Sequence, residues 1–172
     1  MIENKSINNL HELLDDNIRR FIVAESELQN VLPYFIQTAS NIALKNVFQK
    51  YQDMVKMHVN KMEDFFEQES ITYLSASNKV MHAFLSETEE RVNQCIDIAT
   101  KDACLLSCIQ NINHFKIGTY GTAAAFANAL EMNKTAVIFH EFEVNEKRID
   151  DRLSQLAEFE INKKAKTTIG IA

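Results

Sequence analysis

The sequence predicts an all-α protein built as a four-helix bundle. The chain has only 3 glycines and 1 proline in 172 residues, so it lacks the turn residues that a strand-rich fold needs. Hydrophobic residues make up 46% and charged residues 24%, which is typical of a globular domain with a sizeable core. Apolar residues also recur every three or four positions, which places them on one face of a helix. We expect a single domain over residues 1–172, with the bundle at about 6–162 and a short flexible C-terminal tail.

Caps and turns divide this pattern into helices. The predicted helices are 6–39, 41–68, 79–98, 100–132 and 133–162. Their predicted N-terminal caps are Ser6, Asn41, Thr100 and Asn133. The apolar face of the shortest predicted helix, 79–98, consists of Val80, Phe84, Val92 and Ile96. Four of the helices are long enough to span about 45 Å each. They form two hairpins, and a long, partly helical connection joins the second long helix to the third. This up-down order with one crossover is the ferritin-like arrangement of a four-helix bundle.

Charge and composition exclude several classes of protein. The net charge is −6 and no basic face is evident, which argues against nucleic-acid binding. No apolar run approaches the roughly 18 residues of a membrane span, and the N-terminus has no apolar signal core. An odd number of cysteines, 3, fits a reducing compartment. We expect a cytoplasmic protein that binds neither nucleic acid nor membrane.

Each long apolar face is interrupted by polar residues near the middle of its helix. In chain order the interruptions are Glu25, His58, Asn113 with Lys116, and Glu146 with Asp150 one turn later. In a bundle of four such helices, these side chains lie at similar depth. A buried ammonium is costly unless an anion meets it, so we expect Lys116 to face carboxylates.

A di-metal carboxylate site requires this kind of layout. It takes one Glu from each of two helices, and a Glu with a His three residues later from each of the other two. Here Met54 and Val55 precede His58 where a carboxylate is needed, and Lys116 would repel a metal ion. The sequence favours a metal-free, salt-bridged core. A site for iron, manganese or zinc at Glu25, His58, Glu146 and Asp150 is the alternative.

Four stretches resemble, in order and spacing, signatures of the YciE/YciF-like family of bacterial proteins. They are Ala24–Leu28 with Leu32 and Pro33 (SAEKQL...LP), Phe48–Phe66 with His58 (EETxxH), Asn113–Thr122 (EHYEIASYGTL), and Asn145–Asp150 (EEKxxD). The match covers roughly residues 10–160. Its order along the chain is more specific than any single motif.

The resemblance implies a ferritin-like, rubrerythrin-related bundle, usually dimeric and linked to stress responses. The positions that keep acidic or imidazole groups are Glu25, His58, Glu146 and Asp150. The positions that depart from the family's Glu are Met54, Asn113, Lys116 and Asn145. These departures argue against metal binding, and therefore against oxidase or peroxidase chemistry.

We therefore expect a stress-associated protein with a degenerate di-metal site and no assigned catalytic residue. Such a protein needs no cofactor and acts through assembly, as a homodimer, or through a protein partner that the sequence does not identify. The alternative is a residual iron, manganese or zinc oxidase or peroxidase. Full metal loading with oxygen-dependent turnover would favour that alternative.

Overall fold

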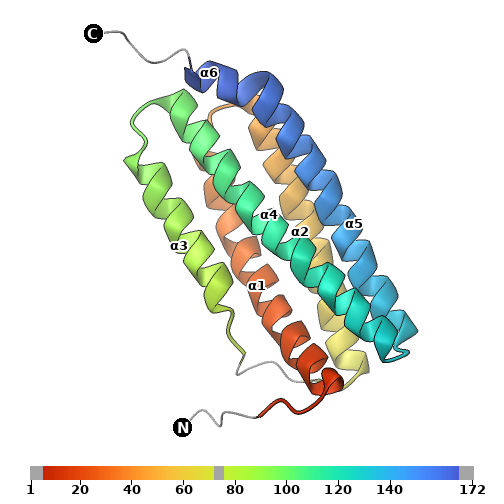
Figure 1. Cartoon of the computed structure of the whole chain (residues 1–172). Helices are drawn as coiled ribbons and strands as arrows, with labels where there is room; N and C mark the ends of the chain where they lie inside the picture. Colours follow the sequence, from red (N-terminus) through yellow and green to blue (C-terminus); the bar gives the residue numbers. More distant parts are fainter. Residues whose placement is uncertain (1–5, 72–75, 167–172) are drawn as a thin grey trace.

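The computed structural model describes residues 6–71 and 76–166, and these residues form helices joined by short connections (Figure 1). The helices are α1 (Leu10–Thr38), α2 (Ile42–Gln68), α3 (Lys79–Gln94), α4 (Ile98–Ala129), α5 (Asn133–Leu156), the π-helical turn η1 (Ala157–Ile161) and α6 (Asn162–Lys166). No strand occurs in the two described ranges, which confirms the all-helical prediction. None of the helices there is long and apolar enough to cross a membrane. The last part of the predicted tail, 167–172, lies outside the described residues.

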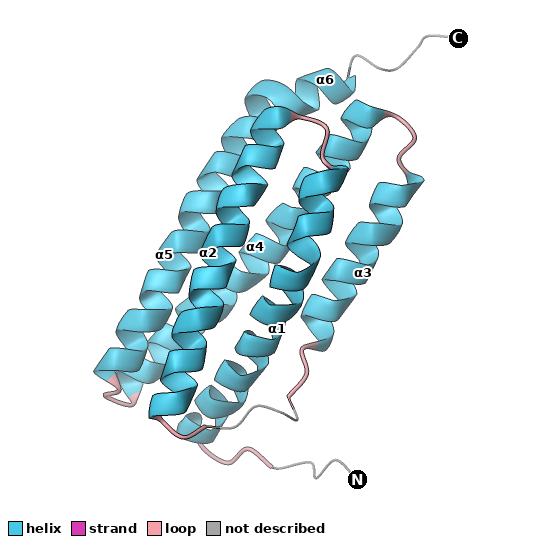
Figure 2. Ribbon diagram, turned by 180° about the vertical axis from the view of Figure 1, so that it is seen from behind, coloured by secondary structure: helices cyan, strands magenta, loops and turns pink. Residues whose placement is uncertain are grey.

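The four long helices lie side by side, and α3 covers one side of them. Figure 2 shows α2 beside α5 and α3 beside α1 and α4. Helix α3 lies between α2 and α4 in the chain, where the partly helical crossover was predicted. Of the apolar positions predicted for α3, Val92 is buried and Phe84 packs partly buried against the core, whereas Val80 is 50% and Ile96 98% exposed. The buried positions of α3 are Met81, Leu85, Thr88 and Val92.

The helix starts follow from side-chain caps, two of which differ from the prediction. Asn9, not Ser6, caps α1 by accepting a hydrogen bond from the Glu12 N–H at 2.9 Å. Asp97, not Thr100, caps α4, and Thr100 N–H is its donor at 2.8 Å. In each case the polar residue directly before the helix accepts from a free backbone N–H of the first turn. Asn41 caps α2 as predicted, whereas Asn133 is the first residue of α5 and not its cap.

Asp102 joins the turn between α1 and α2 to α4. Its side chain is buried, and its two oxygens accept the Ser40 and Asn41 backbone N–H groups at 2.7 and 2.9 Å. The Asn41 side-chain amide in turn donates to Glu160 of η1 at 2.7 Å. A single turn therefore holds together α1, α2, α4 and η1.

The core has two hydrophobic clusters, one towards each end of the long helices. In α1 one cluster includes Phe21 and Ile22, and the other begins at Ala24 and Leu28. The other long helices divide in the same way. The boundary between the clusters falls between Val55 and Met62 in α2, between Ile112 and Tyr120 in α4, and between Phe142 and Ile149 in α5. The polar residues predicted from the interrupted faces lie at these boundaries, so they share one level of the core.

Candidate functional site

At this level, a cluster of polar side chains from four helices is buried. We call it the central cluster. Its members are Glu25 of α1, Tyr51 and His58 of α2, Asn113, Lys116 and Tyr120 of α4, and Glu146 of α5. None of these side chains is more than 3% exposed. The cluster confirms that the interrupted faces of the four long helices converge.

Lys116 lies between the two buried carboxylates. Its Nζ is 2.8 Å from Glu25 Oε1 and 2.6 Å from Glu146 Oε1. The ammonium also faces the ring of Tyr51, 4.8 Å from the ring centroid, which adds a cation–π contact. One ammonium thus bridges carboxylates that come from opposite hairpins.

Hydrogen bonds fix the orientation of both carboxylates. Glu146 Oε2 accepts from the Asn113 amide at 2.6 Å and from the Tyr51 hydroxyl at 3.0 Å. The Tyr120 hydroxyl donates to Glu25 Oε1. The Asn113 amide also donates to the Glu146 backbone carbonyl at 3.1 Å, which ties α4 to α5 at this level. These donors offset part of the cost of burying the two carboxylates.

His58 faces both carboxylates without a hydrogen bond to either. Its Nδ1 is 3.6 Å from Glu25 Oε1 and 3.6 Å from Glu146 Oε1. Its other ring nitrogen, Nε2, faces the Asn145 amide at 3.4 Å. The ring of Phe142 covers the imidazole, with the ring centroids 4.1 Å apart. His58 Nδ1 therefore stays available to a group that enters between the carboxylates.

The charges in the cluster shift the pKa values in different directions. Burial is the largest single influence on Glu25 and opposes its ionisation, but Lys116 and His58 together outweigh it and hold the pKa of Glu25 below its usual value. Burial and the neighbouring Glu25 carboxylate raise the pKa of Glu146, although Lys116 acts against them. Burial alone would lower the pKa of Lys116, yet Glu146 and Glu25 raise it. Lys116 and Glu25 are therefore charged at neutral pH.

A net balance of charge requires one more proton in the cluster. Lys116 neutralises one of the two carboxylates. A proton on Glu146 would neutralise the other, and the raised pKa of Glu146 favours this protonated form. Burial also raises the pKa of Tyr51 well above its usual value, so this residue stays a phenol and can donate to Glu146.

Three groups of the cluster have the chemistry of metal ligands. One donor atom from each of Glu25, His58 and Glu146 lies within 4.8 Å of the others, so together they could hold a metal ion. However, the protonated Lys116 amine already contacts both carboxylates. A cavity of about 10 Å³ borders Glu25 and Lys116, and that is room for roughly one water molecule. The residues present therefore do not fit a di-metal centre while Lys116 is charged.

Asp150, predicted as a fourth ligand, lies outside the central cluster. Its Oδ1 is 2.8 Å from Nε2 of His114, whose side chain is 59% exposed, and the Gln110 amide donates to the same oxygen at 3.4 Å. A residue four positions after Glu146 is rotated by about 40° around the helix, and here this rotation directs the carboxylate to the edge of the α4–α5 contact.

The sequence pattern did not identify the roles of Tyr51 and Tyr120. Both were expected on the apolar faces, and their rings do pack in the core. Their spacing carried a usable signal, because Tyr51 is two turns before His58 and Tyr120 is one turn after Lys116. A tyrosine at the level of buried charges is expected to direct its hydroxyl to them.

Residues 9–166 match the family described as "Domain of unknown function (DUF892)". The chain belongs to this family. A relative, Protein YciF of Escherichia coli (strain K12), is 28% identical over 143 residues, which cover 83% of this chain and 86% of the relative. The resemblance to the YciE/YciF-like family is thereby confirmed.

Two solved structures have a similar fold. The crystal structure of the E. coli stress protein YciF has a TM-score of 0.84 and 24% identity, and the match covers 91% of this chain and 99% of that one. YcfI from Rhodopseudomonas palustris has a TM-score of 0.83 and 20% identity, with 88% and 96% of the two chains covered. At these identities the likeness shows the fold alone.

Proposed function

We propose that this DUF892 protein is a ferritin-like, non-catalytic protein in which Lys116 supplies the positive charge that metal ions supply in a di-metal bundle. The observation that carries the proposal is the position of the Lys116 ammonium, 2.8 and 2.6 Å from two carboxylate oxygens. Those carboxylates come from helices that a bridging metal would otherwise join. The ammonium is positively charged, as a metal ion is, but it belongs to the chain itself. It therefore holds the helices in register without a bound ion that could be exchanged.

The biological role then lies in assembly or in binding a protein partner. The E. coli relative is described as a stress protein, and the R. palustris relative is provisionally described as a structural protein. We carry both descriptions over as proposals: a cytoplasmic, stress-associated homodimer that binds neither nucleic acid nor membrane. Light scattering of the purified protein tests the dimer, since a monomer at micromolar concentration would contradict it.

Metal analysis tests the role of Lys116. The wild-type protein, Lys116→Gln and a control, Lys61→Gln, are incubated with ferrous iron, manganese or zinc, desalted and analysed for metal. Lys61 is a suitable control because its amine makes a surface ion pair with Glu141, outside the central cluster. We expect little metal in the wild type and the control. We expect about one ion per chain in Lys116→Gln, because the two carboxylates and His58 are then free to bind a cation.

A metalloprotein is the second candidate, and the proximity of Glu25, His58 and Glu146 favours it. In that case a metal ion displaces the Lys116 amine, and the two carboxylates and His58 hold the ion. Stoichiometric metal in the wild type, lost in His58→Ala, together with oxygen or peroxide turnover, would establish this candidate and contradict our proposal.

A further inference from the structure

The α2–α5 groove is a second concave site, away from the central cluster. It has a volume of about 570 Å³, within the roughly 300–1,000 Å³ of ligand pockets. Its walls are the first half of α2, the end of α5 and the turn η1. The lining residues are Ala43, Asn46, Val47, Lys50, Ile149, Arg152, Gln155, Leu156, Phe159 and Glu160.

The floor of the groove is apolar. Val47 and Ile149 belong to the hydrophobic core and are each 8% exposed, and the partly buried Leu156 packs against the same cluster. Phe159 stands at the rim with 63% of its surface exposed. An apolar floor with an exposed aromatic ring beside it suits a hydrocarbon group, because filling the groove removes these surfaces from water.

Two cations flank this floor from opposite walls. Lys50 of α2 and Arg152 of α5 are both exposed, and neither forms an ion pair with a carboxylate among the described residues. Arg152 donates only to the neighbouring Gln155 side chain, at 3.1 Å. Two cations without counter-ions on facing helices attract an anion, and the guanidinium can bind a carboxylate through two parallel hydrogen bonds.

The acidic residue of the groove is already paired. Glu160 accepts from the Asn41 side chain at 2.7 Å and from the Lys164 amine at 2.8 Å. These hydrogen bonds lower the pKa of Glu160 and engage its carboxylate with Asn41 and Lys164. The net charge offered to a ligand is therefore positive, in contrast to the −6 of the whole chain.

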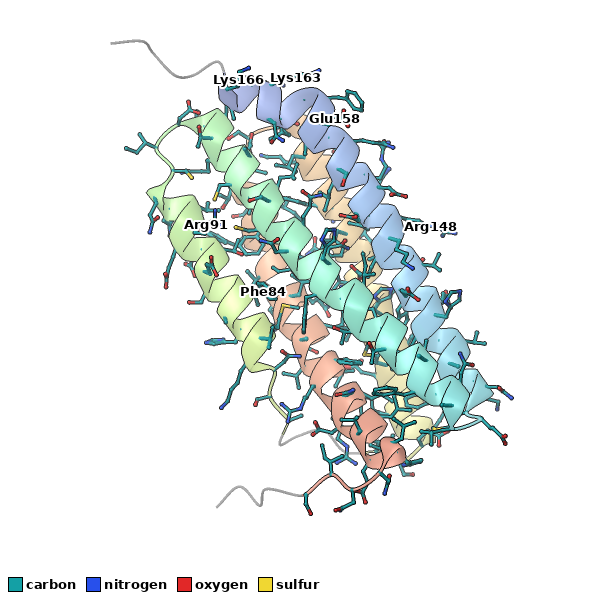
Figure 3. All side chains as sticks on the ribbon, in the orientation of Figure 1. Phe84, Arg91, Arg148, Glu158, Lys163 and Lys166 are labelled. Atoms are coloured by element: carbon teal, nitrogen blue, oxygen red, sulfur yellow. The ribbon has the colours of Figure 1, made fainter. Side chains whose placement is uncertain are left out.

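The π-helical turn forms one end of the groove. The Asn162 N–H donates to the Ala157 carbonyl, five residues earlier, so this turn is wider than an α-helical one. Such turns are rare and frequently occur at functional sites. Here the wide turn carries Phe159, and Lys163 lies 5.6 Å from that ring (Figure 3 labels Lys163 on α6).

We propose that the α2–α5 groove binds an amphiphilic carboxylate, such as a medium-chain fatty acid, with its carboxylate between Lys50 and Arg152 and its hydrocarbon chain on Val47, Ile149 and Leu156. The apolar floor provides affinity, and the two cations select the anion. The site is independent of the central cluster and of whether that cluster binds metal.

Calorimetric titration of the full chain with three probes tests the ligand class. The probes are decanoate below its micellar concentration, decanol, which lacks the charge, and acetate, which lacks the hydrocarbon chain. We expect saturable binding of decanoate, binding of decanol weaker by about tenfold or more, and no binding of acetate. Equal affinity for decanol and decanoate, or no saturable decanoate binding, would overturn the proposal.

Matched double variants test the location. Lys50→Met with Arg152→Met removes both cations and keeps apolar stems. The control is Lys56→Met with Arg148→Met, which removes two exposed cations from the same helices outside the lining (Figure 3 labels Arg148). We expect the first variant to weaken decanoate binding by about tenfold or more and the control to leave it unchanged. An equal loss of decanoate affinity in both double variants would mean that overall charge causes the effect, and it would refute the site.

A spin-labelled fatty acid provides a readout that does not depend on the variants. Bound in the groove, it should broaden the backbone NMR signals of Val47, Ile149 and Phe159. The signals of Ile18, in the other hydrophobic cluster, should stay sharp. Broadening centred on Ile18 or spread over the whole surface would contradict binding in the groove.

Discussion

The central cluster and the α2–α5 groove both contain cations, but only the central cluster supplies its own counter-ions. Lys116 is 3% exposed and contacts two carboxylates, whereas Lys50 and Arg152 are exposed and form no ion pair among the described residues. Water can stabilise an exposed cation, but it cannot reach a buried one, so the chain must provide the anions. The comparison separates a charge that holds the fold together from charges that are available to a ligand.

Removing Lys116 alone should have the largest effect. Lys116→Met leaves two carboxylates buried without their cation, and we expect a loss of about 3–5 kcal/mol in the free energy of unfolding. Lys50→Met, by contrast, should change stability by less than about 0.5 kcal/mol. Urea denaturation followed by circular dichroism measures both. A small loss at Lys116 would mean that the two sites do not differ in the way we describe.

Neutralising the cluster as a whole should be less damaging than removing its cation. In the triple variant Glu25→Gln, Lys116→Met and Glu146→Gln, no buried charge is left unpaired, and the amides can still accept from Tyr51, Asn113 and Tyr120. We expect it to recover about 2 kcal/mol of the loss caused by Lys116→Met alone. If the triple variant is less stable than the single one, the ion pairs are worth more than their burial costs.

Acid should weaken the contribution of Glu25. Its pKa in the folded protein lies below the usual value of 4.5, so its contribution to stability is present above pH 4.5 and is lost as the pH falls through the lowered value. The stability of the wild type should therefore fall more steeply below pH 4.5 than that of Glu25→Gln. Urea midpoints between pH 7 and pH 3 compare them, and parallel curves would show that Glu25 is not the titrating group.

The surface pair of Asp150 and His114 should have the smallest effect. With His114 59% and Asp150 24% exposed, we expect Asp150→Asn to cost about 0.5 kcal/mol or less and to leave metal content unchanged. A double-mutant cycle with His114→Ala measures the interaction energy. Loss of bound metal when Asp150→Asn is added to the Lys116→Gln variant would place Asp150 in the cluster after all.

The interrupted faces predicted the location of the central cluster because burial follows helical periodicity. A polar residue in phase with the apolar face of a long helix must enter the core, and the middle of four antiparallel helices is one level. That reasoning correctly brought together Glu25, His58 and Lys116. It also placed Lys116 against carboxylates, but it could not give the contact distances or show that Asp150 pairs with His114 instead, since both depend on rotamers and on the packing of neighbouring helices.

Short or marginal patterns were less informative. The predicted face of α3 was right at Phe84 and Val92 but wrong at Val80 and Ile96, because that helix covers the bundle with one narrow side and ends at Gln94, before Ile96. The caps Asn9 and Asp97 lay within three residues of the predicted ones, because several polar residues near a helix start can satisfy the same free N–H groups. The groove left no periodic signal, since Lys50 and Arg152 look like ordinary surface residues.

Asp102 has a consequence for the order of folding. Its carboxylate bonds to residues 61 and 62 positions away, and Asn41 of the same turn reaches 119 positions along the chain. Contacts of such long range carry a large loop-closure entropy, so they are expected to form after the local α1–α2 and α4–α5 hairpins. Asp102 then acts on assembled hairpins, and its loss should speed unfolding more than it slows folding.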